Sequence, residues 1–258
     1  MGIPGGPNPL LMRRAAAAAT DDGYQIEGSV RFDISDQANL QRTLGGINKR
    51  KFTVSVWFKK ALEGEDMNFL GNLDTTSWNT GWAFFVDANN KLTFYNDAKD
   101  GAAINMRKIS TQELRDPSAW YHGVCVVDTA NSVAEDRIRL YLNGERITSF
   151  SSSTNPAQDT EVDHGDADQP YNIGYQYEYT AGLIAEPMFI EGLALGPAAF
   201  GEFTSSGTWN PKAFALPVPN DGTTWSGMLT SAAGFDGSGT SNGSPTRAFT
   251  GAGPGNTT

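Results

Sequence analysis

Apolar and polar residues alternate with a period of two along several stretches between residues 28 and 192, and this pattern constrains the fold more than any other feature. Successive side chains of a β-strand point to opposite faces, so each such stretch predicts a strand with one buried face. In the clearest stretch, 51–59, the apolar positions are Phe52, Val54, Val56 and Phe58. The opposite face would carry Thr53, Ser55, Trp57 and Lys59.

Turn signals separate these stretches and indicate how they pair. Asn143-Gly144 follows the alternating stretch 138–142, and both residues tolerate the positive φ of a type I′ hairpin turn. We therefore expect residues 146–150 to return beside that stretch, and 151–169 to form a polar, acidic loop. The nearly continuous apolar run 120–127 is typical of a central strand covered on both faces. The spacing predicts about ten to twelve short antiparallel strands in an all-β, two-sheet jelly-roll sandwich.

Composition excludes several classes of function. The chain has 29 Asp and Glu against 19 Lys and Arg, a net charge of −10, whereas nucleic-acid binding needs a basic face. No run of about 18 apolar residues exists, so no membrane insertion is expected. Cys125 is the single cysteine, which excludes an internal disulfide. The two histidines, His122 and His164, are too few for a histidine metal site or a charge-relay triad.

The two ends of the chain differ from its middle. Residues 1–22 read as an extended N-terminal arm, because early glycines and prolines block regular structure. This arm is either an unstructured tail or a segment that orders on a partner. Residues 23–203 form the predicted jelly-roll domain, and 204–258 form an irregular C-terminal extension rich in Gly, Ser and Thr.

Four residues of the predicted strands have expected places in the core. Trp57 and Trp120 are predicted to be buried aromatics that each remove about 150–250 Å² from solvent. His122 is predicted to be a hydrogen-bonded core histidine, and Cys125 a small buried apolar residue.

Several segments, taken in order, resemble one protein family. They are 29–35, 51–59, 115–127, 139–150, 172–174, 186–195, 200–203 and 209–212. Together they resemble the laminin-G-like, concanavalin A-like jelly-roll structural proteins of tailed bacteriophages, which serve as fibre or capsid decoration components. The resemblance covers roughly residues 28–212 and implies a concanavalin A-like jelly roll.

This resemblance implies a non-enzymatic virion structural protein, a module of a tail or head fibre or a capsid decoration. Its partners would be other virion proteins, namely capsid, portal, tail or fibre subunits, and further copies of itself in a homo-oligomer. Its termini would attach it to neighbouring subunits, because extended segments can add to a neighbour's sheet edge. The expected attachment residues in the arm are Leu10, Leu11, Met12, Arg13 and Arg14.

A carbohydrate-binding host-recognition module is the alternative expectation, with a host surface glycan as ligand. Sugar binding needs exposed aromatic rings beside polar groups. Trp78 lies in a loop, and Tyr175, Tyr177 and Tyr179 would share one face of a strand. Trp82 and Tyr95 are further candidates. The competing interpretation is that these rings pack on the C-terminal extension or on a neighbouring chain.

A glycan hydrolase is the least favoured expectation. Glu161-x-Asp163-x-x-Asp166 is the best match to the carboxylate spacing of jelly-roll glucanases, but its Gly- and Asp-rich surroundings predict a loop. Retaining hydrolysis requires two carboxyls held about 5–5.5 Å apart on a rigid element. Asp163, Asp166 and Asp168 could instead bind calcium through their carboxylates. Otherwise we expect a solvated loop and no cofactor.

Overall fold

The structure, a computed structural model, describes residues 23–43, 48–73, 81–97, 106–164, 170–215 and 236–237. The expected attachment residues 10–14 lie outside these ranges, as do Trp78, Asp166 and Asp168. The helices of the described part are the 3₁₀ turns η2 (Ile34–Asp36), η4 (Ala134–Asp136) and η5 (Pro197–Ala199). None of them has the length and apolar character needed to cross a membrane.

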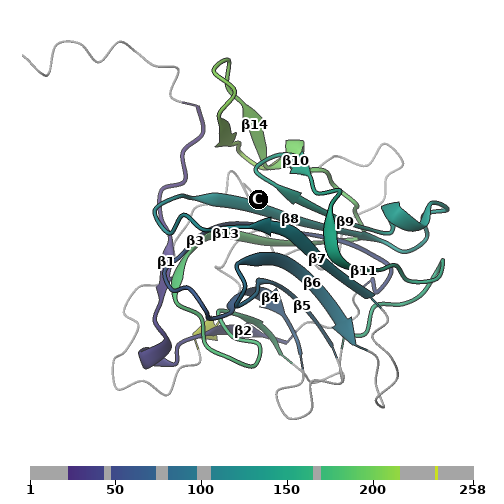
Figure 1. Ribbon diagram of the computed structural model, residues 1–258, viewed down its shortest axis with the longest axis horizontal. Coiled ribbons are helices and arrows are strands. Elements are labelled where there is room, and N and C mark those ends of the chain that lie inside the picture. Colours follow the sequence, from purple (N-terminus) through teal and green to yellow (C-terminus); the bar gives the residue numbers. More distant parts are fainter. Residues whose placement is uncertain are drawn as a thin grey trace, which may run out of the picture.

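Two antiparallel sheets pack face to face (Figure 1). The strands of sheet A are, in spatial order, β1 (Val30–Phe32), β13 (Gly182–Glu191), β3 (Lys51–Lys60), β8 (Tyr121–Asp128), β9 (Ile138–Leu142) and β10 (Glu145–Arg146). Those of sheet B are β11 (Phe150–Thr154), β7 (Met106–Glu113), β6 (Lys91–Asp97), β5 (Gly81–Val86), β4 (Met67–Gly71), β12 (Tyr171–Ile173), β2 (Leu40–Arg42) and β16 (Asp236–Gly237). The predicted two-sheet antiparallel jelly-roll sandwich is confirmed.

Apolar side chains from alternate strand positions fill the space between the sheets. Phe52 and Phe58, at two of the alternating positions of β3, are fully buried. The ring centroid of Phe52 lies 5.1 Å from that of Trp82 in β5, and that of Phe58 lies 4.3 Å from that of Phe69 in β4. Cys125 of β8 belongs to the same core and is fully buried, as predicted. These cross-sheet contacts hold the two sheets together.

A second apolar layer covers the outer face of sheet A. After β13 the chain doubles back across this face, and Leu193 and Leu195 pack with Val124 of β8 in a separate cluster. Thr53 of β3 anchors the segment, since its hydroxyl donates to the Leu193 carbonyl and accepts from the Leu195 N–H, both at 2.8 Å. Strand β8 is therefore buried on both faces, as its continuous apolar run predicts.

The predicted hairpin at Asn143-Gly144 is present, but its return strand is short. Asn143 and Gly144 have φ of 48° and 85°, as a type I′ turn requires. Strand β10 pairs with β9, and the Ile147 N–H still donates to the Leu140 carbonyl of β9 at 2.9 Å, so the expected return over 146–150 is wrong beyond Ile147. The side chains of Ile147 and Phe150 pack against the core, so the chain crosses to sheet B. There β11 pairs with β7, and the expected loop 151–169 begins only after this strand.

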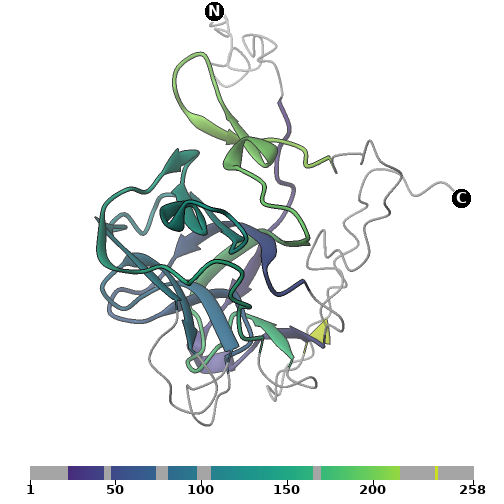
Figure 2. The ribbon, with the colours of Figure 1, turned by 90° about the vertical axis from the view of Figure 1, so that its right-hand side faces the viewer.

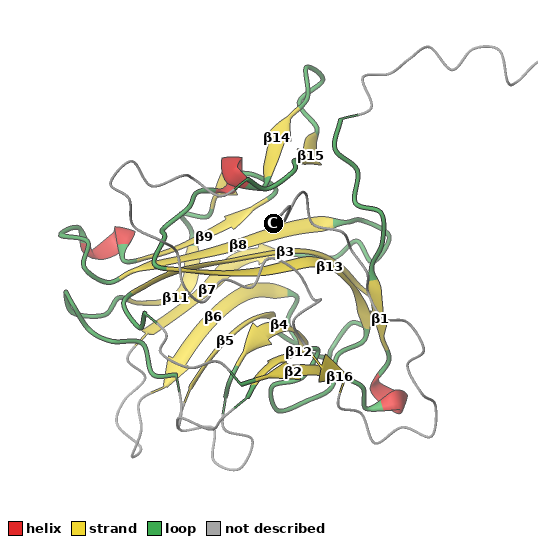
Figure 3. Ribbon diagram, turned by 180° about the vertical axis from the view of Figure 1, so that it is seen from behind, coloured by secondary structure: helices red, strands yellow, loops and turns green. Residues whose placement is uncertain are grey.

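A hairpin of β14 (Gly201–Phe203) and β15 (Trp209–Pro211) projects from the sandwich beyond sheet A (Figures 2 and 3). It follows η5, whose neighbour Phe200 is buried in the outer apolar layer. The boundary expected between residues 203 and 204 falls inside this hairpin. The division of the chain into an arm, a jelly roll and an extension stays a prediction.

Candidate functional site

A groove of about 590 Å³ opens where the chain crosses from sheet A to sheet B. Its walls come from the end of β7, the residue before β8, the β9–β10 turn with residues 145–149, and the β14–β15 hairpin. Four aromatic side chains line it: Trp57, Trp120, Phe203 and Trp209. The volume lies within the range of small-molecule binding sites, about 300–1,000 Å³.

Three rings stack in a row at the wall of the groove. The centroid of the His122 ring lies 4.6 Å from that of Trp57 and 5.9 Å from that of Trp209, with ring planes 22° and 21° apart. Trp57 and His122 are direct partners in the β3–β8 register, so both side chains stand on the same face of sheet A. Strand pairing therefore creates the platform on which Trp209 rests.

Hydrogen bonds fix the middle ring of this row. The indole Nε1–H of Trp209 donates to His122 Nδ1 at 3.1 Å, and Ser55 Oγ lies 2.9 Å from His122 Nε2. Because an indole can only donate, Nδ1 is unprotonated and Nε2 carries the hydrogen. Burial of the ring lowers the pKa of His122 to about 3. His122 is thus a neutral, hydrogen-bonded core histidine, as predicted, and its structural task is to hold Trp209.

Two glycines leave the space that the Trp209 indole fills. A Cβ atom at Gly144 or at Gly201 would lie 2.4 Å from a ring carbon of Trp209. Phe203 packs edge-on against the same indole, with centroids 4.8 Å apart and planes at 65°. The Asn143-Gly144 turn therefore has a second role besides reversing the chain, because it seats an aromatic from a segment about 65 residues later in the sequence.

Trp120 and Phe203 present their rings to solvent, with 41% and 52% of their surface exposed. The expectation of a buried Trp120 is wrong, whereas Trp57, 7% exposed, is buried as predicted. Trp120 follows a turn in which the Asp116 carboxylate accepts bonds from the Ser118 N–H and hydroxyl, at 2.8 and 2.6 Å. It precedes β8 and so lies beyond the layer that covers that strand. In the sequence, the turn-forming Asp116 is the one local indication that Trp120 lies at the edge of a turn and not inside a strand.

Hydrogen-bonding groups surround the rings. The groove is also lined by Thr111, Gln112, Asn143, Glu145, Arg146 and Thr148. The side-chain oxygen of Asn143 accepts the backbone N–H of His122 at 2.8 Å, so its amide NH₂ is the group it can offer to a ligand. Apolar ring faces beside donors and acceptors form a surface suited to a ligand that is apolar on one side and hydroxylated at its edges.

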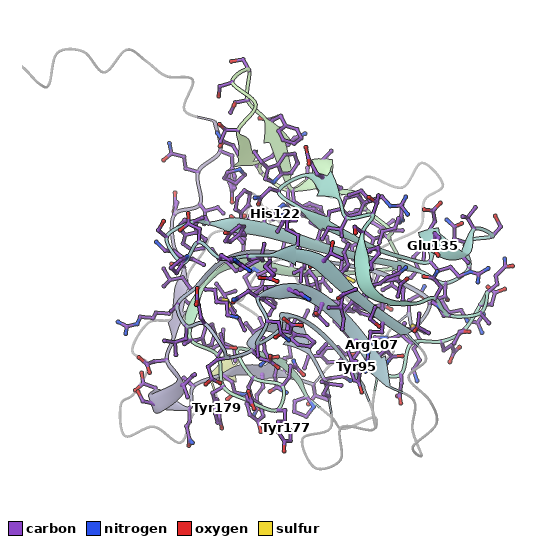
Figure 4. The ribbon with its side chains drawn as sticks, in the orientation of Figure 1. Tyr95, Arg107, His122, Glu135, Tyr177 and Tyr179 are labelled. Atoms are coloured by element: carbon purple, nitrogen blue, oxygen red, sulfur yellow. The ribbon has the colours of Figure 1, made fainter. Side chains whose placement is uncertain are left out.

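The prediction that Tyr175, Tyr177 and Tyr179 share one face of a strand is wrong, and sugar binding by these tyrosines stays a prediction. Residues 174–180 form a tight loop, closed by a bridge between Tyr175 and Tyr179, whose ring centroids are 4.5 Å apart. Gly174 turns the chain out of β12 with a φ of 83°. Tyr177, at the tip, is 45% exposed. Figure 4 shows Tyr177 and Tyr179 on the opposite side of the sandwich from His122, so the tyrosines do not join the groove.

The other two aromatic candidates differ from each other. Trp82 is fully buried between the sheets, and its indole N–H donates to His164 Nδ1 at 3.0 Å. It is therefore a core residue and cannot contact a sugar. Tyr95 of β6 is half-buried, and the Arg107 guanidinium lies 5.0 Å from its ring centroid, as Figure 4 illustrates.

The acidic segment has no regular structure over residues 155–164. Glu161 pairs with Arg50 at 3.3 Å. The Asn96 side chain bonds to the backbone N–H and carbonyl of Asp163, at 3.3 and 3.1 Å. Among the described residues, no group of three or more His, Cys, Asp and Glu side chains could hold a metal ion. Since the other two aspartates of the expected site are not described, calcium binding stays a prediction.

Comparison with known proteins identifies the fold family. The model of the concanavalin A-like lectin/glucanases superfamily matches residues 32–193. No curated protein matches the sequence.

Three solved structures of different proteins match the chain at low sequence identity. A heptameric SAP-like pentraxin from Limulus polyphemus is 14% identical over 65% of this chain and 72% of its own, with a TM-score of 0.39. Domain 4 of an extracellular arabinanase from Geobacillus stearothermophilus, in complex with arabinotriose, is 17% identical over 62% and 69%, with a TM-score of 0.43. The enzymatically active domain of tailspike protein 2 of bacteriophage CBA120 is 12% identical over 63% and 25%, with a TM-score of 0.41.

Proposed function

Because the chain belongs to the concanavalin A-like lectin/glucanases superfamily, we propose that it is a carbohydrate-binding module whose groove beside Trp120 holds the glycan. The observation that carries the proposal is the exposed Trp120 ring in a groove that also offers amide, hydroxyl and charged side chains. The family includes, by its description, both lectins and glucanases, so the residues of the groove have to distinguish glycan binding from glycan cleavage.

The chemistry of the groove matches that of a sugar ring. One face of a pyranose presents mainly C–H groups, which pack on an aromatic face, while its hydroxyls need partners at the edges. Trp120 and Phe203 supply exposed aromatic surface. The Asn143 amide and the Gln112 side chain supply donors and acceptors beside it. The rigid seat of Trp209, against His122 and Gly144, keeps this wall in place before a ligand arrives.

We propose binding without cleavage. Glycoside hydrolysis needs two carboxyl groups that flank the scissile bond. Glu145 is the one carboxylate among the described residues that line the groove. His122 is a neutral ring whose two nitrogens are both hydrogen-bonded to protein groups, so neither nitrogen is available to exchange a proton with a substrate. These features support a binding role and disfavour the hydrolase alternative.

The test is Trp120→Ala in the 258-residue chain, measured by calorimetry and on an array of oligosaccharides. We expect affinity to fall at least about tenfold, which corresponds to about 1.4 kcal/mol, because a central aromatic contact is lost. Tyr177→Ala is the matched control. It removes an aromatic of similar exposure, 45% against 41%, on the other side of the sandwich, and should leave binding unchanged.

Two outcomes contradict the proposal in different ways. If Tyr177→Ala abolishes binding and Trp120→Ala does not, the glycan site lies at the 174–180 loop. If the folded wild-type chain binds no oligosaccharide of the array, the carbohydrate-binding function itself is refuted.

The sequence resemblance to phage structural proteins supports a setting for such a module. We propose that it sits on a virion as a fibre or capsid decoration component and contacts a host surface glycan there. Its attachment would use residues 10–14 of the arm. Mass spectrometry of purified particles would test this placement, and absence of the protein from intact particles would contradict it.

A further inference from the structure

Charge is distributed unevenly in the groove. Two charged side chains line it, Glu145 and Arg146 of the short strand β10. The guanidinium of Arg146 donates to the Asp136 carboxylate at 2.5 Å and to the Glu135 carbonyl at 3.0 Å. Its positive charge is therefore compensated by η4, on the protein itself.

Glu145 has no such compensation. Its side chain is exposed, and within the described ranges no lysine, arginine or histidine forms an ion pair with it. The carboxylate of Glu145 and the neutralised Arg146 together leave the groove with a net negative charge. The chain as a whole carries −10, which adds a repulsive background for anions.

Resting on the proposed function, we infer that the groove selects uncharged sugars and rejects anionic ones, such as sialic acids, uronic acids and sulfated sugars, and that Glu145 sets this preference. A neutral sugar can donate its hydroxyls to the Glu145 carboxylate in charge-assisted hydrogen bonds. An anionic sugar in the same place meets a second negative charge a few ångströms away. At a protein surface this repulsion corresponds to about a tenfold loss of affinity.

Matched ligand pairs test the inference. Lactose and 3′-sialyllactose share a disaccharide and differ by one carboxylate-bearing sugar, and galactose with galacturonate forms a second pair that differs only at C6. We measure the ratio of Kd between the anionic and the neutral member of each pair. For the wild-type chain this ratio should be about ten or more. It should fall at least about threefold in Glu145→Gln, and still further in Glu145→Lys.

Asp159→Asn provides the matched control for the change in total charge. Asp159 is exposed, and its N–H bonds to Thr129 at 2.8 Å, directly after β8, at the opposite end of that strand from Trp120. Its φ of 61° is one that asparagine tolerates. This variant loses one negative charge without touching the groove, so its Kd ratio should equal that of the wild type.

The outcomes of these measurements distinguish failure of this inference from failure of the proposed function. Equal affinities of the wild type for both members of a pair overturn the inference, as does a ratio that Glu145→Gln and Glu145→Lys leave unmoved. In both of these cases the proposed function survives if the affinity for neutral oligosaccharides still falls in Trp120→Ala. Failure of the folded chain to bind any neutral or anionic oligosaccharide overturns both.

Discussion

Acidification is expected to destabilise this fold through its two histidines. His122 is fully buried and His164 is 6% exposed, and burial lowers the pKa of each to about 3 from the ordinary value of 6.5. The folded chain therefore keeps both rings neutral, while the unfolded chain protonates them below pH 6.5. The stability that depends on these neutral rings is complete above pH 6.5 and is lost as the pH falls toward 3.

The size of the effect follows from these values. Between pH 7 and pH 5 each histidine withholds a proton that the unfolded chain binds, which costs about 2 kcal/mol, so the pair costs about 4 kcal/mol. Asp66 acts in the opposite direction, because burial, and after it the nearby Glu178, raises its pKa to about 6. Its partial exposure weakens that offset to about 1 kcal/mol. Burial also raises the pKa values of Glu186 and Glu191, which adds to this offset. We therefore expect a net loss of at most about 3 kcal/mol.

Urea unfolding at pH 7 and pH 5 measures this loss, and NMR of the two imidazole rings measures its cause. Neither ring should titrate between pH 7 and pH 5, and His122 should show the tautomer with hydrogen on Nε2. A ring resonance that titrates with a midpoint near 6.5 would refute the reasoning, because that histidine would then be hydrated in the folded chain. Equal unfolding free energies at the two pH values would refute it as well.

Two predictions concern the stability of the groove wall. Trp57→Ala should lower the free energy of unfolding by about 3–5 kcal/mol, because the Trp57 side chain is only 7% exposed. Trp120→Ala should lower it by about 1 kcal/mol or less, because Trp120 is 41% exposed. Equal losses of the two variants in urea unfolding would contradict this prediction. Gly144→Ala should lower the Tm more than Gly64→Ala. Both glycines have positive φ, 85° and 79°, but only the Cβ at Gly144 would collide with Trp209, so equal shifts in calorimetry would show that the indole moves freely.

Much of the sandwich could be predicted because the responsible signals are local. The alternation at Phe52 and Phe58 reports which face of β3 is buried, and that holds wherever the strand lies in a sheet. Asn143-Gly144 identifies a type I′ turn because positive φ is a property of those two residues alone. The apolar run around Cys125 indicates cover on both faces without revealing what supplies it.

The groove could not be predicted, because exposure depends on what else reaches a residue. Trp120 and Trp57 look alike in the sequence, yet Trp57 is buried against the His122 ring and Trp120 is exposed. The tyrosine spacing predicts a shared strand face, but the turn at Gly174 folds those residues into a loop. A local pattern carries no information on either outcome.

The sequence by itself determined the strand period, the hairpin turn and the acidic balance, since each depends on a residue and its near neighbours or on composition alone. Only the tertiary structure decided that Trp209 lies against His122 and Gly144, which are 87 and 65 residues away in the sequence. It also decided that Arg146 forms an ion pair with Asp136, whereas Glu145 has no ion-pair partner among the described residues. Strand pairing and the crossing of the chain between the sheets bring such groups together. The free energy of packing the whole sandwich stabilises this arrangement, so no short segment of the sequence encodes it.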